Sequence, residues 1–279
     1  MIKIVTDSTA YLHEDFVREH DIRVVPLCVH FHDRDFKEGV DLSYEEFYAR
    51  LKEAPELPTT SQPSAGEFHA VFEELARAGH EIVTVTISSR LSGTWNSAMA
   101  AKDMLPDAEI SVVDSLSTSI GLQLMVEAAV KAIEAGASRQ QVVDRIEEIK
   151  AKILVLFVVD TLEYLAKGGR IGNAKAFLGT LLKVKPILVL QDGAIEPLEQ
   201  IRSKGKAKAR MLEIVSERFD GETADAKAAI AQALVPDEAA AIAQELQRLL
   251  GCAEPSVSPV GPVIGTHTGP GVIAVAAYK

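Results

Sequence analysis

Short apolar runs alternate with longer amphipathic stretches up to Asp160. The short runs are rich in β-branched residues and predict strands at residues 2–6, 22–29, 82–87, 110–113 and 153–159. The longer stretches carry apolar residues at helical spacing and predict helices at residues 44–52, 66–78, 94–104, 121–135 and 139–151. Because strands and helices alternate at this spacing, we expect βαβ units around a mostly parallel sheet.

The pattern changes after Asp160. It predicts helices at residues 161–165, 174–182, 206–219 and 236–250, and strands at residues 186–190, 195–200, 263–265 and 272–278. Asp192-Gly193 between two strand-like runs favours a tight hairpin turn. We therefore expect two domains: an N-terminal α/β domain at residues 1–160, with a mostly parallel sheet flanked by helices, and a C-terminal mixed α/β domain at residues 161–279.

The charge balance narrows the classes of partner. The chain has 279 residues, with 29 Lys and Arg against 40 Asp and Glu, for a formal net charge of −11. An acidic chain of this kind lacks the basic surface of a nucleic-acid-binding protein and is repelled by an anionic membrane. Its longest strongly apolar run, residues 153–159, is far shorter than the ~20 residues of a membrane-spanning helix. We expect neither nucleic-acid binding nor stable membrane insertion.

Cysteine usage and the first residues favour a cytoplasmic location. Cys28 and Cys252 are isolated and form no CxxC pair, which fits a reducing compartment. The apolar run after Met1 ends at Asp7, too early for a signal peptide.

Three segments are rich in hydroxyl groups and glycine. Residues 60–65 read Thr-Ser-Gln-Pro-Ser-Ala, residues 88–94 read Ser-Ser-Arg-Leu-Ser-Gly-Thr, and residues 265–271 read Gly-Thr-His-Thr-Gly-Pro-Gly. Together they offer hydroxyls, amides at helix starts and one histidine, with very little negative charge. This chemistry suits a small anionic group such as a carboxylate or a phosphate.

The first segment divides into a capping part and an extended part. Ser64 followed by Glu67 predicts a capping box at a helix start. Thr60 and Ser61 precede Pro63, which favours an extended chain before it, so their hydroxyls are free to face a cleft. The alternative is that both hydroxyls only satisfy local backbone groups.

The second segment follows a predicted strand and opens a predicted helix, which is where ligands bind in open α/β sheets. Gly93 permits a close approach of the backbone. Ser92 and Thr94 can cap the helix, line a pocket, or do both. The surroundings of Ser92 lack the Gly-x-Ser-x-Gly pattern of a nucleophile elbow.

The third segment places Thr266 and His267 in a predicted loop between two apolar strands. The glycines around His267 indicate a shaped loop and favour ligand contact, although a loop histidine is commonly only a satisfied hydrogen-bonding group. Arg170, in Gly-Gly-Arg at residues 168–170, can bind a phosphate through two hydrogen bonds.

Arg202 belongs to a local cluster of basic residues with Lys204, Lys206 and Lys208. The cluster is either a solvated helix start or a docking patch for an acidic partner or a phosphate. No Walker loop, usable dinucleotide loop or metal-ligand cluster is evident, so we expect no cofactor.

Taken together, these motifs resemble the DegV family of bacterial fatty-acid-binding proteins. The match runs along nearly the whole chain, through Thr6-Asp7-Ser8, residues 60–64, residues 88–94, Val113-Asp114-Ser115, residues 168–171 and residues 265–271. Six motifs in this order are far more specific than any one of them.

The resemblance implies two α/β domains with a fatty acid buried between them. It implies that hydroxyls matching Thr60 and Ser92 hold the carboxylate, with the histidine matching His267 close by. Some members are the lipid-binding subunit of a bacterial fatty acid kinase, in which a separate ATP-binding subunit with a dihydroxyacetone-kinase-like domain phosphorylates the acyl chain. In this chain Arg170 and Arg202 are then candidates for contact with the phosphate or the kinase.

We therefore expect a protein that binds a long-chain fatty acid, has no catalytic residue of its own and presents the ligand to a kinase subunit. The expected ligand-binding residues are Thr60, Ser61, Ser92, Gly93, Thr94, Thr266 and His267. The expected tunnel residues are Phe157, Leu162, Leu165, Phe177, Leu181, Leu182 and Ile264. Two alternatives remain: a module that binds another small anion, and a hydrolase or acyltransferase that uses Ser92 and His267.

Overall fold

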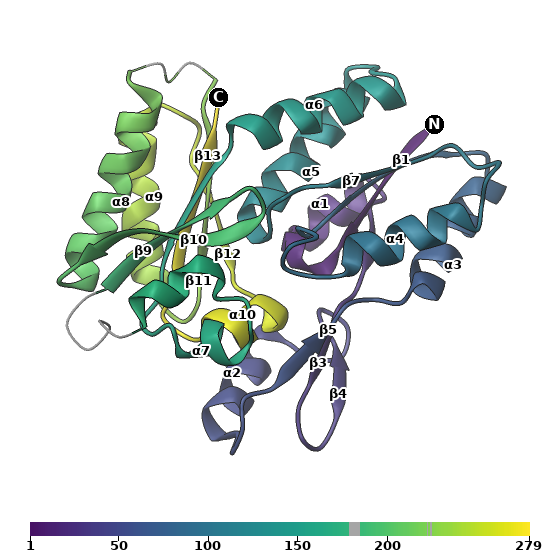
Figure 1. The fold of residues 1–279 in the computed structure, drawn as a ribbon. Coiled ribbons are helices and arrows are strands. Elements are labelled where there is room, and N and C mark those ends of the chain that lie inside the picture. The colour runs from purple at the N-terminus through teal and green to yellow at the C-terminus, as the bar shows by residue number, and fades with distance from the viewer. Residues whose placement is uncertain (179–184, 222, 224) are drawn as a thin grey trace.

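The first sheet of the protein is entirely parallel, as the sequence predicts. The computed structural model describes residues 1–178, 185–221, 223 and 225–279. Its four-stranded sheet has the order β2-β1-β6-β7, formed by Arg23–Val25, Ile2–Asp7, Glu81–Thr86 and Ile110–Asp114. Figure 1 shows this sheet at the N-terminal end of the molecule, apart from the sheet that contains the C-terminus.

Helices cover both faces of the four-stranded sheet. Successive residues of a strand pack into two different apolar clusters, as Ile4 and Val5 of β1 do. One cluster includes Phe68 of α3 (Ala65–Arg77) and residues of α4 (Thr94–Asp103). The other includes residues of α5 (Ser119–Glu134) and α6 (Arg139–Lys152). This two-sided burial explains why the strands are apolar at nearly every position.

The second sheet has six strands and mixed pairing. Its order is β10-β9-β8-β13-β11-β12, formed by Ala194–Ile201, Lys185–Gln191, Leu154–Val158, Ile273–Tyr278, Lys227–Gln232 and Ser256–Pro259. All neighbouring pairs are antiparallel except β11 and β12. The predicted hairpin at Asp192-Gly193 is present, with Gln191 opposite Ala194. Two helices, α8 (Lys204–Phe219) and α9 (Pro236–Leu250), cover its outer face.

Strand β8 pairs with β9 and β13 and so belongs to the six-stranded sheet. Its place before Asp160 had predicted a strand of the parallel sheet in the N-terminal domain. A division at residue 160 leaves β8 on one side and its pairing partners on the other. An apolar run of five residues fits a parallel or an antiparallel position equally well when both faces are buried, so its pattern could not decide between the sheets.

A small third sheet carries part of the candidate site. It consists of β4 (Asp35–Lys37), β3 (Cys28–His30) and β5 (Thr59–Ser61), and both strand pairs are antiparallel. Helix α2 (Tyr44–Glu53) lies between β4 and β5 in the chain. The single strand predicted at residues 22–29 was wrong, because β2 and β3 belong to different sheets. Pro26 lies between them and has no N–H to continue the pairing.

The remaining elements are short. They are η1 (Ser8–Ala10), α1 (Glu14–Glu19), α7 (Glu163–Lys167) and η2 (Gly172–Phe177). The helix predicted at residues 174–182 overlaps this last 3-10 turn, and its positions 179–182 lie outside the described residues. Within the described part of the chain, no helix combines the length and the apolar character needed to cross a membrane.

The strand predicted at residues 263–265 was also wrong, because these residues lie in the helix α10 (Pro262–Thr268). Pro262 occupies the first turn, where its missing N–H costs nothing. The carboxylate of Glu38 accepts a hydrogen bond from the Val263 amide at 2.8 Å. Glu38 is distant from α10 in the chain, so the local apolar pattern could not reveal that it stabilises the start of this helix.

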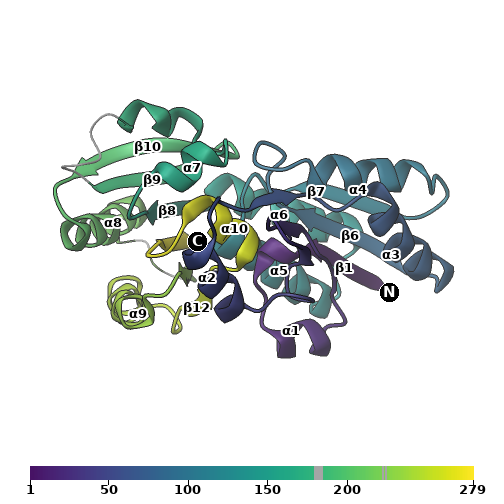
Figure 2. The same cartoon turned by 90° about the horizontal axis from the view of Figure 1, so that it is seen from below.

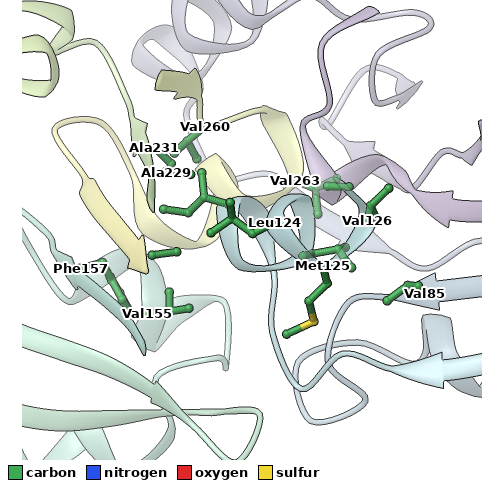
Figure 3. Close-up of a cluster of buried hydrophobic side chains, with 14 of the residues drawn as sticks. Val85, Leu124, Met125, Val126, Val155, Phe157, Ala229, Ala231, Val260 and Val263 are labelled. Carbon is green, nitrogen blue, oxygen red and sulfur yellow. The ribbon is translucent and has the colours of Figure 1, made fainter. Parts of the chain in front are cut away.

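Helix α5 joins the two large sheets. Nearly all of its first twelve residues are buried, and Figure 2 shows it between the elements of the two sheets. One apolar cluster contains Val85 of β6, Leu124 and Met125 of α5, and Phe157 of β8. Figure 3 shows the side chains of this cluster around α5. The inner faces of both sheets therefore share one core.

Candidate ligand-binding site

A cavity lies where the three sheets and α10 meet. Its apolar lining residues are Leu27, Ile87, Leu91, Ile120, Val155, Phe157, Leu165, Leu190, Ile195, Ala231, Val260, Val263, Ile264, Val272 and Ala274. Its polar lining residues are Thr60, Ser61, Gln62, Ser92, Thr118, Ser119, Arg170, His267 and Thr268. No carboxylate is among them. We call this second set the polar wall.

The cavity is much larger than a packing defect. The centre of a water molecule can occupy about 110 Å³ of it, whereas one buried water needs only about 10–15 Å³ by the same measure. An apolar majority with a few polar groups is the usual lining of a small-molecule site.

The six-stranded sheet supplies an entirely apolar side of the cavity. We call it the strand wall; it comprises Val155, Phe157, Leu190, Ile195, Ala231 and Ala274. Ala231 lies opposite Ala274 in the β11–β13 pair, and Ala274 lies opposite Phe157 in the β13–β8 pair. These three residues form a row across the inner face of the sheet, and the two alanines in that row leave space that larger side chains would fill.

A hydrogen bond between Thr60 and His267 forms the centre of the polar wall. Thr60 lies on β5, where it pairs with Val29, and His267 lies on α10. The Thr60 Oγ1 and His267 Nε2 atoms are 2.8 Å apart. Two residues more than two hundred positions apart in the chain are thus brought together at the cavity.

The environment keeps His267 neutral. Its side chain is 8% exposed. Burial, and secondarily the Arg170 cation, lower the pKa of His267 from 6.5 to about 4. At neutral pH the imidazole therefore has one N–H donor and one acceptor nitrogen. It can fix the direction of the Thr60 hydroxyl without adding a buried charge.

Ser92 lies in the loop between β6 and α4. Its Oγ is 2.9 Å from the Oγ1 of Thr94, which is the first residue of α4. No side chain caps this helix, whose N-cap is Gly93. Ser92 therefore contributes a half-buried hydroxyl to the cavity and is not used as a cap. A nucleophilic serine needs a hydrogen bond to its base, whereas the bond of His267 goes to Thr60.

Gly93 links this loop to the segment that contains Thr60. Its amide donates to Oε1 of Gln62 at 3.2 Å. A Cβ on Gly93 would lie 2.4 Å from the Gln62 side chain. A larger residue here would have to displace the Gln62 amide, whose bond to Gly93 brings the two hydroxyl-rich segments together.

Arg170 supplies the cation of the polar wall. Its Nη1 donates to the carbonyl of Gly168 at 2.8 Å, and its Nε donates to the carbonyl of Leu91 at 3.2 Å. Among the described residues no carboxylate pairs with it. These two bonds hold the guanidinium at the cavity while its charge remains uncompensated.

Gly168 also fits closely against the histidine. A Cβ at this position would lie 2.2 Å from Nδ1 of His267. The imidazole is therefore enclosed by Gly168 on one side and hydrogen-bonded to Thr60 through its other nitrogen.

The structure brings some of the predicted site residues together and leaves others aside. Thr60, Ser61, Ser92, His267 and Arg170 line the cavity, as do Phe157, Leu165 and Ile264 of the predicted tunnel. The residues that do not line it are Gly93, Thr94, Thr266, Arg202, Leu162 and Phe177. Leu181 and Leu182 lie outside the described residues.

Three of the predicted site residues that do not line the cavity have local structural roles. Gly93 and Thr94 support the loop of Ser92 through the bonds above. The Thr266 hydroxyl donates back to the carbonyl of Pro262 within α10. Arg202 is exposed between β10 and α8.

Thr118, Ser119 and Thr268 also line the cavity although none of them was a predicted site residue, and Gln62 lines it without a predicted role of its own. Thr118 and Ser119 belong to a run of hydroxyl residues between Ser115 and Ser119 that directly follows β7. A hydroxyl-rich loop at the carboxyl end of a parallel strand was a usable signal.

Glu38 anchors the helix that carries His267. Besides the Val263 amide, its carboxylate accepts from Ser8 Oγ at 2.6 Å and from the Tyr11 hydroxyl at 3.3 Å. It is 4% exposed. Burial, partly offset by these hydrogen bonds, raises the pKa of Glu38 from 4.5 to about 7.

Two aspartates at strand ends have structural roles. Asp7 accepts from the amides of Thr9 and Ile87 at 3.0 and 2.6 Å. Asp114 accepts from the amides of Ser89 and Leu116 at 3.1 and 3.0 Å. Each carboxylate ties two loops at the carboxyl edge of the four-stranded sheet, and neither lines the cavity. The described residues contain no group of three or more His, Cys, Asp or Glu arranged to hold a metal ion.

The fold and the cavity define a class of α/β protein in which a mostly apolar cavity with one polar wall lies between two large sheets. Over residues 1–279 the chain matches the family model described as an uncharacterised protein of the DegV family. It is 41% identical over 279 residues to a DegV domain-containing protein of Halalkalibacterium halodurans, covering 99% of this chain and 98% of the relative. The chain therefore belongs to the DegV family.

Solved structures agree with this assignment. A DegV family protein from Thermus thermophilus, described by its fatty acid binding, has a TM-score of 0.94 at 35% identity, with 100% of this chain and 99% of that one covered. A stearic acid-binding protein from Eubacterium ventriosum has a TM-score of 0.93 at 31% identity, with 100% and 98% covered. The mixed α/β fold predicted from the sequence is confirmed.

Proposed function

We propose that this protein binds a long-chain fatty acid, with the acyl chain against the strand wall and the carboxylate at Thr60, Ser92 and His267. The Thr60–His267 hydrogen bond in an otherwise largely apolar cavity is the observation that carries the proposal. The fatty acid binding of the proteins from Thermus thermophilus and Eubacterium ventriosum supports the same ligand class.

Hydrogen-bond directions explain how the uncharged groups of Thr60, Ser92 and His267 can hold a carboxylate. A carboxylate only accepts, so the Thr60 hydroxyl must point its proton at the ligand. Thr60 then accepts from Nε2 of His267, which selects the tautomer with the proton on that nitrogen. The lowered pKa of His267 keeps this arrangement intact through the neutral range. Ser92 supplies a second hydroxyl donor.

The acyl chain supplies the affinity. Each buried methylene contributes about 0.8 kcal/mol, so a C16 chain is strongly favoured in the cavity. The carboxylate bonds orient the ligand and satisfy its charge, since an unpaired buried carboxylate would be costly.

We further propose that the bound fatty acid is presented in the cytoplasm to a separate ATP-binding kinase subunit for formation of an acyl phosphate. Arg170 supports this step, because its uncompensated cation lies at the cavity beside the proposed carboxylate position. Arg202 is a second candidate for the kinase contact, on an exposed surface. On this proposal the ligand lies between the regions of residues 1–160 and 161–279.

Palmitate binding tests the site directly. We expect native mass spectrometry to find one C14–C18 fatty acid on the purified protein, and calorimetry to show palmitate binding by the delipidated protein. Thr60→Val and Ser92→Ala each remove one hydroxyl bond to a charged group, so we expect each to weaken binding about 10–100-fold.

Thr59→Val is the matched control, because Thr59 lies on the same strand but outside the cavity. Unchanged affinity in both site variants would overturn the carboxylate assignment. Absence of any bound or added fatty acid would favour the alternative of another small anion, to be tested with acetate and phosphate.

Turnover with a kinase subunit tests the second step. With palmitate, ATP and an ATP-binding fatty acid kinase subunit, we expect acyl phosphate to form only when this protein is present. Arg170→Gln should reduce its formation about tenfold or more while palmitate affinity changes by less than about threefold, since the cation acts on the phosphate. Equal turnover of the variant would remove Arg170 from this role.

A further inference from the structure

Three buried polar atoms that line the cavity have no hydrogen-bond partner among the described residues. They are Nδ1 of His267, Oγ1 of Thr118 and Oγ of Ser119. His267 already belongs to the proposed carboxylate position. Thr118 and Ser119 share no hydrogen bond with Thr60, Ser92 or His267. An unpaired buried hydroxyl loses hydration without compensation.

These two residues start the central helix α5. Ser119 is 7% exposed and is the first residue of this 16-residue helix. Thr118 is its N-cap, yet its side chain makes no capping bond. The first amides of a helix have no acceptor within the helix and carry its positive dipole end. The hydroxyls and the helix end therefore favour an oxygen atom that accepts hydrogen bonds.

The backbone holds this position firmly. The carbonyl of Ser117 accepts from the Ser88 amide at 2.7 Å and from the Ser115 hydroxyl at 3.1 Å. Ser119 has φ of +52°, in the left-handed region that side-chain-bearing residues rarely adopt. Non-glycine residues in this conformation occur preferentially at functional sites.

This position borders both polar and apolar groups. Ile120 and Val155 line the same cavity, and a Cβ on Gly121 would lie 2.1 Å from the Ser117 hydroxyl and 3.0 Å from the Val155 side chain. The Thr60–His267 pair, which suits a carboxylate, is separate from it in the hydrogen-bond network.

We propose that Thr118 and Ser119 form a second hydrogen-bonding position, which takes an oxygen substituent on the acyl chain. The substituent is a hydroxyl or a keto oxygen, so the ligand class includes oxygenated fatty acids. This inference rests on the proposed function, because it assumes that the carboxylate is held at Thr60 and Ser92.

A positional series of monohydroxy and monoketo palmitates tests the inference, with palmitate as the reference ligand in calorimetry. An oxygen buried against apolar residues loses hydration, so most isomers should bind about tenfold more weakly than palmitate. The isomer whose oxygen reaches Thr118 and Ser119 should bind about threefold to tenfold more tightly than palmitate. The hydroxyl and keto series separate the two sources of oxygen.

The double variant Thr118→Val/Ser119→Gly removes both hydroxyls, and glycine adopts the positive φ of residue 119 without steric strain. We expect it to abolish the gain of the preferred isomer and to leave palmitate affinity within about twofold. Thr84→Val is the matched control, because Thr84 also has a buried, unpartnered hydroxyl but does not line the cavity.

The possible outcomes are distinct. If every oxygenated isomer binds wild-type protein more weakly than palmitate, the hydroxyls bind only structural water and the inference is overturned. If the double variant loses as much affinity for palmitate as for the oxygenated isomers, Thr118 and Ser119 bind the carboxylate, and the inference is also overturned. If neither palmitate nor any isomer binds wild-type protein, the proposed function itself fails. The wild-type series decides the question even if the variant does not fold.

Discussion

The polar wall and the strand wall enclose one cavity but are built in different ways. The strand wall consists of side chains on one continuous face of the six-stranded sheet, where pairing fixes Ala231, Ala274 and Phe157 in a row. The polar wall has no residue from that sheet and is assembled from loops, β5, the start of α5 and α10. Its geometry depends on long-range hydrogen bonds such as Thr60–His267.

This difference predicts that the two walls respond to different perturbations. Packing determines how much acyl chain the strand wall accepts, and it does not depend on pH. Hydrogen bonds and buried titratable groups determine the polar wall, so changes in protonation should affect it alone.

Glu38→Gln should change how the free energy of unfolding depends on pH, because Glu38 anchors α10, the helix that carries His267 of the polar wall. Below the ordinary pKa of 4.5, Glu38 holds a proton in both the folded and the unfolded chain; between 4.5 and about 7 only the folded form keeps it. The wild type therefore loses stability as pH rises through this window, by about 3 kcal/mol from this group. Relative to wild type, the variant should gain about that free energy of unfolding between pH 4 and pH 8. Urea denaturation at the two pH values measures it, and a constant difference would contradict the prediction.

Ala274→Leu should alter the strand wall without disturbing the polar wall. Its added carbons fill space that about three ligand methylenes would occupy, so palmitate binding should weaken by about 2–3 kcal/mol, or roughly 50-fold. Octanoate, which is shorter, should lose much less. Calorimetry with both ligands makes the comparison, and an equal loss for the two would mean that the carboxylate position had been disturbed.

Gly168→Ala should displace His267 from Thr60, because the new Cβ would lie 2.2 Å from Nδ1. We expect palmitate affinity to fall about tenfold, because Thr60 loses the hydrogen bond from His267 that directs its hydroxyl at the carboxylate. Gly205→Ala is the control, since nothing lies within 4 Å of the added atom. That change in α8 should leave binding intact and stabilise the protein by about 0.5–1 kcal/mol.

Ser64→Ala should separate helix stability from ligand binding. The capping box of Ser64 and Glu67 is present as predicted, and its loss should lower the free energy of unfolding by about 1 kcal/mol. Palmitate affinity should stay within about twofold, because pairing with Val29 holds Thr60 in place. A parallel loss of affinity would show that the start of α3 supports the polar wall.

The sequence predicted the parts of the molecule whose causes are local. The parallel sheet, the Asp192-Gly193 hairpin and the Ser64 cap follow from apolar spacing and turn or cap chemistry in neighbouring residues. The family motifs also led to Thr60, Ser92, Arg170 and His267, all of which line the cavity.

What the sequence did not predict depends on contacts between distant residues. Helix α10 was taken for a strand because its start is stabilised by Glu38, more than two hundred positions away. The sheet to which β8 belongs depends on its pairing with β9 and β13, which its own apolar pattern does not specify. The loop of Thr118 and Ser119 was visible in the sequence as a hydroxyl-rich segment after β7, but that their hydroxyls are buried at the cavity without partners depends on the tertiary structure.

The position of β13 also constrains how the protein is synthesised. This strand lies between β8 and β11 in the sheet, yet it follows both in the chain and is separated from β8 by more than a hundred residues. Until the ribosome has released residues 273–278, β8 and β11 present unpaired edges to their surroundings. Pairing over such sequence separation is slow. We therefore expect an interval during synthesis, before β13 is available, in which the edges of β8 and β11 can pair with other chains.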